Sequence, residues 1–394
     1  MVKKITTVII CILTVVAAAG CSAGSGIYDD GYSQLRDKYY FDPYMQGSFY
    51  QAWKLNIDDG SILIACPDPL CSHGFNEKTC PFSSVIPIKI ADAGRYLFYI
   101  GKSIDGSNKY SIYSFDTEEN STSKIYTYDK FPSTNYTLMY GEGRLYFDLP
   151  KVSDSGGQLV ESVRRDVMYY DVKTKKTVKF GQKDEQDVLL FADNGKVYYR
   201  DMNGAVYASG GKFDKTDPLP LPSGGETSPF GGYWECGPGY IANSYAPADI
   251  YLYNEKTSVK LPDEAADKTL VGLSCTGNTF YFTTQTKPNE DGEDGHYTVN
   301  VFILDKDGEY KLYAIQSDYD FYVLKGHNDC VVCSILNEYK DGEVLIPGTE
   351  EENAQNDLMR IDLQNGAVSL YNTYSDSVLD MRTADITVKT ERVK

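Results

Sequence analysis

The chain has 394 residues, 34 of them tyrosine, and a formal net charge of −18 at pH 7. This acidity, with no basic patch to reverse it, argues against binding to nucleic acid or to anionic lipid, and it favours solubility or cationic partners, metal ions included. The length exceeds that of one ordinary domain of roughly 150 residues, unless the fold is a closed repeat architecture.

Residues 1–20 have the pattern of an export signal. Lys3 and Lys4 precede a fifteen-residue apolar run that is short for a membrane-spanning helix, and the run ends in "AAGC". This ending resembles the lipobox of bacterial lipoproteins, which implies a diacylglyceryl lipid on Cys21. We therefore expect the protein to be exported and anchored to the outer face of the cytoplasmic membrane through a tether, residues 21–38. Simple cleavage and secretion is the alternative.

A repeat organises the rest of the chain. A glycine turn followed by a strand of alternating aromatic and β-branched residues recurs with spacings of 49, 52, 44, 38 and 49 residues. Each copy is followed by a strand, a short polar turn and another strand. The recurring glycines are Gly94, Gly143, Gly195, Gly239, Gly277 and, in a weaker copy, Gly326.

With an earlier unit at Phe49–Ala65, the repeat predicts an all-β fold over residues 39–375, a β-propeller of seven four-stranded blades. Two stacked β-sandwiches are the alternative. Tyrosines at alternate strand positions are expected to pack between blades. Residues 376–394 include an alternating stretch, Ala384–Thr390, which we expect to close the ring by completing the first blade. The alternative for that segment is a tail without structure.

The stretch "CPDPLCSHGFNEKTCPF" lies in a long connection between the first two blades, residues 66–84. Cys66, Cys71, His73 and Cys80 together supply three thiolates and an imidazole, a set that suits a structural zinc ion in tetrahedral geometry. Four protein ligands would leave no open position for water, so such a metal would be structural. A disulfide with one spare thiol, or plain packing, remains open.

"CPDPLCSH" followed by "CPF" resembles a motif in uncharacterised β-propeller lipoproteins of Gram-positive bacteria. The resemblance implies the same fold and the same lipid-anchored address. It implies no reaction, because that family has no established activity.

Two further motifs are weaker. Cys330 and Cys333 form a C-x-x-C pair, but on a strand these positions face opposite sides, which favours two buried thiols over a redox site. The acidic stretch Asn289–His296 is more consistent with a solvated turn than with a calcium loop.

These patterns favour a non-catalytic propeller that binds a protein, peptide or glycan. A glycan-active hydrolase with carboxylates at the propeller channel is the first alternative, and a metal or redox sensor is the second.

Overall fold

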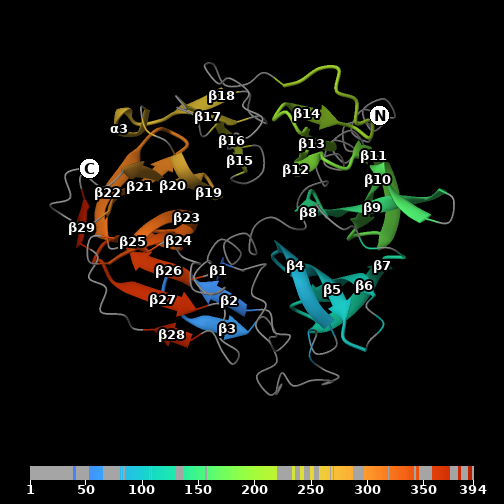
Figure 1. The fold of residues 1–394 in the computed structure, drawn as a ribbon, viewed down its shortest axis with the longest axis horizontal. Coiled ribbons are helices and arrows are strands. Elements are labelled where there is room, and N and C mark those ends of the chain that lie inside the picture. The colour runs from blue at the N-terminus through green and yellow to red at the C-terminus, as the bar shows by residue number, and fades with distance from the viewer. Residues whose placement is uncertain are drawn as a thin grey trace, which may run out of the picture.

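The computed structural model describes residues 39–40, 53–64, 80, 82, 85–105, 107, 109–129, 131, 136–155, 158–219, 233–235, 240–243, 249–252, 257–266, 268, 270–286, 297–317, 319–340, 343–345, 357–372, 380–382 and 389–392. The predicted all-β propeller is confirmed. Seven antiparallel sheets follow one another around a central opening (Figure 1).

The first four sheets come in chain order. They are β1 (Tyr39–Tyr40), β2 (Trp53–Asn56) and β3 (Ile62–Ile64); β4 (Val85–Ala93), β5 (Tyr96–Ser103), β6 (Tyr110–Asp116) and β7 (Ser121–Thr127); β8 (Leu138–Gly141), β9 (Arg144–Ser155), β10 (Gln158–Asp171) and β11 (Lys176–Asp184); and β12 (Val188–Asp193), β13 (Lys196–Arg200) and β14 (Val206–Ser209).

The last three sheets complete the ring. They are β15 (Tyr233–Glu235), β16 (Tyr240–Asn243), β17 (Asp249–Leu252) and β18 (Thr257–Lys260); β19 (Leu270–Thr276), β20 (Thr279–Thr286), β21 (Tyr297–Asp305), β22 (Tyr310–Ser317) and β29 (Lys389–Arg392); and β23 (Tyr319–His327), β24 (Cys330–Lys340), β26 (Asp357–Asp362), β27 (Val368–Asn372) and β28 (Asp380–Arg382), with β25 (Glu343–Leu345) beside β24. A short helix, α3 (Asp263–Ala266), follows β18.

The number of complete blades stays a prediction. Only three of the seven sheets have four strands among the described residues, while the sheets β1–β3 and β12–β14 have three. The described helix is far too short and polar to cross a membrane, and no other described helix is long enough.

The core lies between neighbouring sheets. One apolar cluster joins β4–β6 to β8–β10, the next joins β9–β11 to β12–β14, and another joins β20–β22 to β23–β26. The last sheet packs on the first through Leu55, Val332 and Tyr371. Tyrosines are among the largest fully buried side chains, as the alternating pattern predicted: Tyr99, Tyr146, Tyr199 and Tyr371.

The repeated turns also follow the sequence pattern. Gly94, Gly143, Gly195 and Gly277 all have positive φ, which glycine adopts without a steric penalty. The weaker copy differs, because Gly326 lies within β23, where a Cβ atom would collide with the ring of Tyr281.

Polar hairpins between the third and fourth strands begin with an aspartate that binds its own turn. Oδ1 of Asp305 accepts hydrogen bonds from the backbone N–H groups of Asp307 and Glu309, both at 2.9 Å. Asp116, Asp171 and Asp362 make comparable contacts. Each aspartate therefore stabilises its turn through contacts within a few residues, which is why the sequence shows the recurring polar turns.

The C-terminal strand was expected to complete the first blade. For the part of that strand that the structure describes, this prediction is wrong. Lys389 and Thr390 pair with Gln316 and Ile315 of β22, not with the first sheet. The outer edge of β22 supplies the backbone partners for this pairing, over Tyr313–Gln316. Residues 384–388 of the expected strand lie outside the described residues.

Candidate functional site

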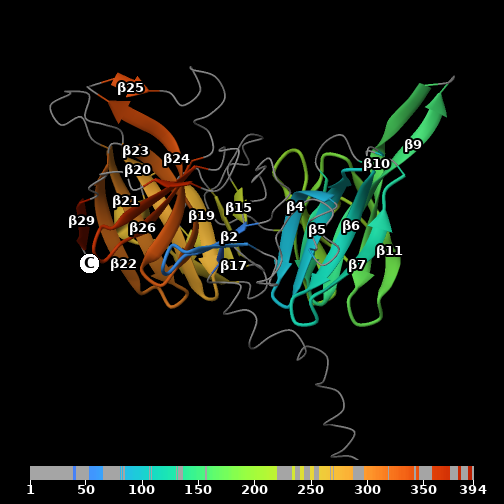
Figure 2. The ribbon, with the colours of Figure 1, turned by 90° about the horizontal axis from the view of Figure 1, so that it is seen from below.

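A pair of long strands rises from one face of the ring. β9 and β10 extend well beyond the strands beside them, and Figure 2 shows their common end rising from the side of the ring on which β24 and β25 also extend. We call residues 149–164 of this pair the ribbon, and the side of the ring from which it rises the ribbon face.

Three charged side chains are fully buried at the base of the ribbon. Asp148 on β9, Arg165 on β10 and Lys183 on β11 all have exposed fractions of 0%. Arg165 lies directly opposite Lys183 and Pro150, and Asp148 is two residues from Pro150. Because strand side chains alternate, the three charges share one face of the sheet.

Asp148 neutralises both cations. Its Oδ2 lies 3.2 Å from Nη1 of Arg165 and 3.3 Å from Nζ of Lys183, while its Oδ1 accepts the Thr137 N–H at 2.8 Å. Nη2 of Arg165 also binds Oε1 of Glu185 at 2.9 Å. Each buried charge therefore has an opposite partner, which a buried ion needs to offset its lost hydration.

Burial shifts the proton equilibria of this cluster. The pKa of Lys183 is lowered by burial, against the opposing attraction of Asp148. The pKa of the Tyr128 phenol is raised well above its usual value by burial, and next by the nearby charge of Asp148. The Tyr128 hydroxyl is buried and has no hydrogen-bond partner among the described residues.

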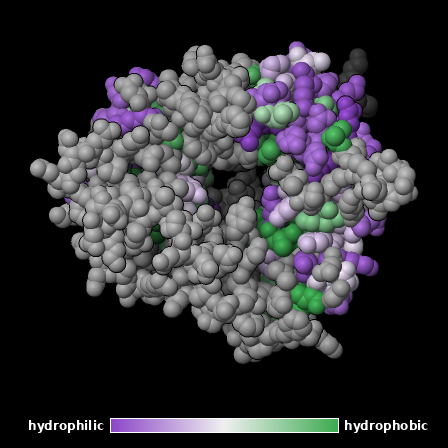
Figure 3. Space-filling view, viewed as in Figure 1, coloured by the Kyte–Doolittle hydropathy of each residue, from purple (hydrophilic) through white to green (hydrophobic). Residues whose placement is uncertain are grey.

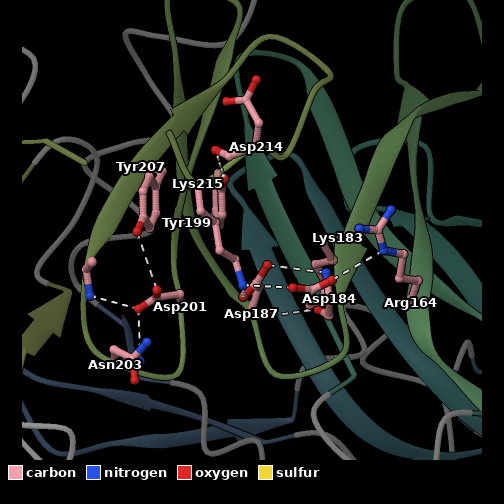
Figure 4. Close-up of polar contacts among 11 residues, drawn as sticks. Arg164, Lys183, Asp184, Asp187, Tyr199, Asp201, Asn203, Tyr207, Asp214 and Lys215 are labelled. Atoms are coloured by element: carbon pink, nitrogen blue, oxygen red, sulfur yellow. Dashed lines mark hydrogen bonds and ion pairs between the residues drawn. The ribbon is translucent and has the colours of Figure 1, made fainter. Parts of the chain in front are cut away.

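A second group of charges joins this sheet to the next one (Figure 4). Nζ of Lys215 lies 2.8 Å from Oδ2 of Asp184 and 2.9 Å from Oδ1 of Asp187, and Asp187 is buried. The pKa of Lys215 is raised: partial burial opposes the rise, but the hydrogen bonds to Asp184 and Asp187 outweigh it. We call Asp148, Arg165, Lys183, Asp184, Glu185, Asp187 and Lys215 the ion cluster.

Lys215 reaches the turn after β11 from the segment that follows β14, residues 210–219. This segment crosses to β11, where the Gly211 carbonyl lies against Gly181 so closely that a Cβ atom there would come within 2.3 Å of it. Phe213 packs edge-on against Phe180 of β11, and Tyr199 donates a hydrogen bond to the Asp214 carbonyl at 2.8 Å.

Three exposed apolar residues lie within a few residues of the ion cluster, along a strand or across a strand pair. Val163 is 75% exposed, Met202 66% and Val188 37%. The Val163 carbonyl accepts the Glu185 N–H at 2.8 Å, three residues before Val188, and Val188 pairs with Arg200, two residues before Met202. Figure 3 looks onto this face and shows apolar groups among polar ones around a hollow centre.

The predicted metal set is placed only in part. Cys66, Cys71 and His73 lie outside the described residues, as does Cys21. Cys80 is buried with Phe82, Val85 and Tyr99 against β4–β6. Within the described part of the chain, no group of three or more His, Cys, Asp or Glu side chains is placed to hold a metal ion. The zinc assignment remains a prediction, and so does the reading of Asn289–His296, which also lies outside.

The interpretation of Cys330 and Cys333 as buried thiols is confirmed. Cys333 belongs to the core between β20–β22 and β23–β26, whereas Cys330 faces Leu55 and Tyr371. The two thiols point to opposite sides of the sheet. Burial raises the pKa of Cys330 to about 11 and that of Cys333 well above its usual value.

His327, which the sequence assigned to no site, lies where the first and last sheets meet. Its Nδ1 is 2.6 Å from Oδ1 of Asp58, and Asn328 donates to the same oxygen at 3.1 Å. Arg360 donates to the Ile57 carbonyl at 2.7 Å and to the Asp58 carbonyl. Cys330 is close by: Nη2 of Arg360 lies 3.2 Å from its Sγ, which is 3.8 Å from the Asp58 carbonyl, so these contacts join the last sheet to the first.

The ion cluster was not identified from the sequence, because strand alternation was considered for apolar and aromatic side chains only. One signal was present: Arg165 has the same strand parity as Val167, which is fully buried.

No protein-family model and no curated protein matches the chain. Among solved structures, it is similar to an acylaminoacyl peptidase in complex with Z-Gly-Gly-Phe-chloromethyl ketone, with 13% identity and a TM-score of 0.44 over 78% of this chain and 49% of the other. A structure from work on two prolyl endopeptidases gives 10% identity and a TM-score of 0.43 over 87% and 47%.

The β-propeller domain of the Trilobed protease from Pyrococcus furiosus gives 14% identity and a TM-score of 0.40 over 77% and 90%. The chain thus spans about half the length of the two peptidases. At these identities the likeness concerns the fold alone.

Proposed function

We propose that the protein is an exported, lipid-anchored propeller that holds a partner protein on its ribbon face and performs no chemistry of its own. The observation that carries this proposal is the position of Val163, Val188 and Met202. Exposed large apolar side chains that gather in one place are typical of interaction surfaces. Here they surround a base fixed by buried ion pairs, so little ordering entropy would be lost on binding.

The contacts of the carboxylates in the ion cluster favour a binding function over a hydrolase. A carboxylate pair of the glycosidase kind must reach its substrate. Asp148 is fully buried between two cations, and Asp184 and Asp187 share Lys215. These contacts suit a structural base better than a general acid.

Binding through this face is tested by photo-crosslinking in the native cells. A benzophenone amino acid replaces Met202 in one variant and Val178 in the other. Val178, on β11, is also an exposed large apolar residue, at 41%, but it lies away from the ion cluster. We expect a crosslinked protein from position 202 and none from position 178. Equal yields, or none from either, would contradict the proposal.

The proposed membrane anchoring depends on lipidation of Cys21 and is tested by labelling cells with palmitate. Wild type should incorporate the label and partition with membranes, while Cys21→Ser should do neither. Unlabelled wild-type protein in the medium would instead support simple secretion.

The predicted zinc site of Cys66, Cys71, His73 and Cys80 is tested on soluble protein that begins at Ser22 and is purified without chelator. One equivalent of zinc, lost in Cys71→Ser and in His73→Ala, would support it. Absence of metal together with two fewer titratable thiols than the seven cysteines after Cys21 would replace it by a disulfide.

A further inference from the structure

The ribbon has two long edges that no other described strand covers. β8 pairs with β9 only at Arg144–Phe147, and β11 pairs with β10 only from Arg164 onward. Beyond those points β9 and β10 pair with each other alone, out to Ser155 and Gln158. The backbone groups on the outer sides of the ribbon are therefore available to an additional strand.

The two edges differ in how they are protected. The β9 edge contains Pro150, which has no N–H to donate, and Lys151, whose charged side chain is 45% exposed. Proline and lysine are the residues that commonly guard exposed edges against unwanted pairing. The β10 edge, "QLVESV" from Gln158 to Val163, contains neither and has three residues of high strand propensity or apolar character. It does carry the charged Glu161, and its register against β9 shifts between Glu161 and Arg165, so the regular part of the edge is Gln158 to Glu161.

The open edge continues a ladder that β11 leaves unfinished. β11 ends at Asp184, opposite Arg164, and the next backbone bond runs from the Glu185 N–H to the Val163 carbonyl at 2.8 Å. The chain then turns away toward Asp187. A strand arriving from outside would take the place that β11 vacates, beside residues 158–162.

The base of this edge is rigid and partly apolar. Arg165 is held by Asp148 and by Glu185, so the first residues of the free edge are fixed in position. Val163 adds an exposed apolar side chain at that point. Backbone hydrogen bonds along the edge would supply affinity, and apolar side chains of the arriving strand would find Val163 and its neighbours.

We propose that the β10 edge from Gln158 to Ser162 binds an extended segment of a partner protein by strand addition, with apolar residues at alternate positions of that segment. This inference rests on the proposed binding function and names the chemistry of the partner. Only an extended polypeptide can satisfy a row of backbone donors and acceptors at the spacing of a strand.

The test first locates the segment. A benzophenone amino acid at Gln158 and, separately, at Met202 is crosslinked in the native cells, with Val178 as the control position. Mass spectrometry then identifies the crosslinked segment, which is synthesised as a peptide. Two further peptides carry N-methyl groups on alternate backbone amides, one on the odd positions and one on the even positions.

Strand addition makes the two methylated peptides unequal, because successive amides of a strand point in opposite directions. We expect one of them to bind the soluble protein at least about tenfold more weakly than the unmodified peptide, and the other to bind within about twofold, with tenfold corresponding to about 1.4 kcal/mol. Equal effects of both methylation patterns would overturn strand addition while leaving binding through the ribbon face intact.

Other outcomes are equally decisive. A crosslinked product that contains two copies of this chain would replace the partner by self-association. A crosslink at Met202 with none at Gln158 would move the contact off the ribbon. No crosslink at either position would overturn the proposed function together with this inference.

Discussion

Replacing Asp148 by alanine should destabilise the protein severely. The substitution leaves Arg165 and Lys183, both with exposed fractions of 0%, facing one another without their shared counter-charge. Removing one member of a buried ion pair costs about 3–5 kcal/mol. The Thr137 N–H also loses its acceptor, which adds about 1 kcal/mol. The expected loss of about 4–6 kcal/mol is a large part of a typical unfolding free energy of about 5–15 kcal/mol.

The assay is urea unfolding of the soluble chain that begins at Ser22, followed by fluorescence and checked by refolding. Asp148→Asn is the matched variant, because it keeps an acceptor for Thr137 and loses only the charge; it should cost about 3 kcal/mol. Lys183→Met provides a background with a single buried cation. There Asp148→Ala should cost at least about 1 kcal/mol less than in the wild type, which a double-mutant cycle measures.

Two results would refute this reasoning. A loss below about 1 kcal/mol for Asp148→Ala would mean that water reaches the two cations after the substitution, so that the site is not truly buried. Additive effects of Asp148→Ala and Lys183→Met would mean that the two charges do not interact.

Three further predictions concern other parts of the ring. Burial raises the pKa values of Tyr99 and Tyr128, so the folded state keeps protons that the unfolded chain releases above pH 10. The free energy of unfolding should not depend on these two phenols below pH 10 and should fall above pH 10. The tyrosinate absorbance of Tyr99 and Tyr128 at 295 nm should therefore rise only as the circular dichroism of the folded protein is lost. Full tyrosine ionisation in a protein that is still folded would contradict this prediction. Cys330, with a pKa of about 11, should be about 0.1% thiolate at pH 8, so iodoacetamide should label it and Cys333 only after unfolding, and rapid labelling of native protein would count against their burial. Arg360→Met should cost about 2–4 kcal/mol and speed proteolysis at the seam between the first and last sheets, because one buried and one partly buried carbonyl lose a charged donor, whereas the same change at an exposed arginine should cost under about 0.5 kcal/mol.

The sequence by itself determined the elements and the kind of fold. A strand's alternation, a glycine at positive φ and an aspartate that binds its own turn are all local features, so they appear in the order of the residues. The turns at Gly94 and Asp305 were predicted for that reason and are found in the structure. The opposite orientation of Cys330 and Cys333 followed from the same period of two.

Only the tertiary structure decided which charges meet and which edges stay open. Asp148, Arg165, Lys183 and Lys215 come from four separate segments, and they converge because strand register and the packing of two sheets place them together. The partner of the C-terminal strand, β22, was likewise visible only in the tertiary structure. Such contacts depend on distances between segments that no local pattern encodes, and buried charges are the extreme case, since their burial becomes favourable only once all their partners are in place.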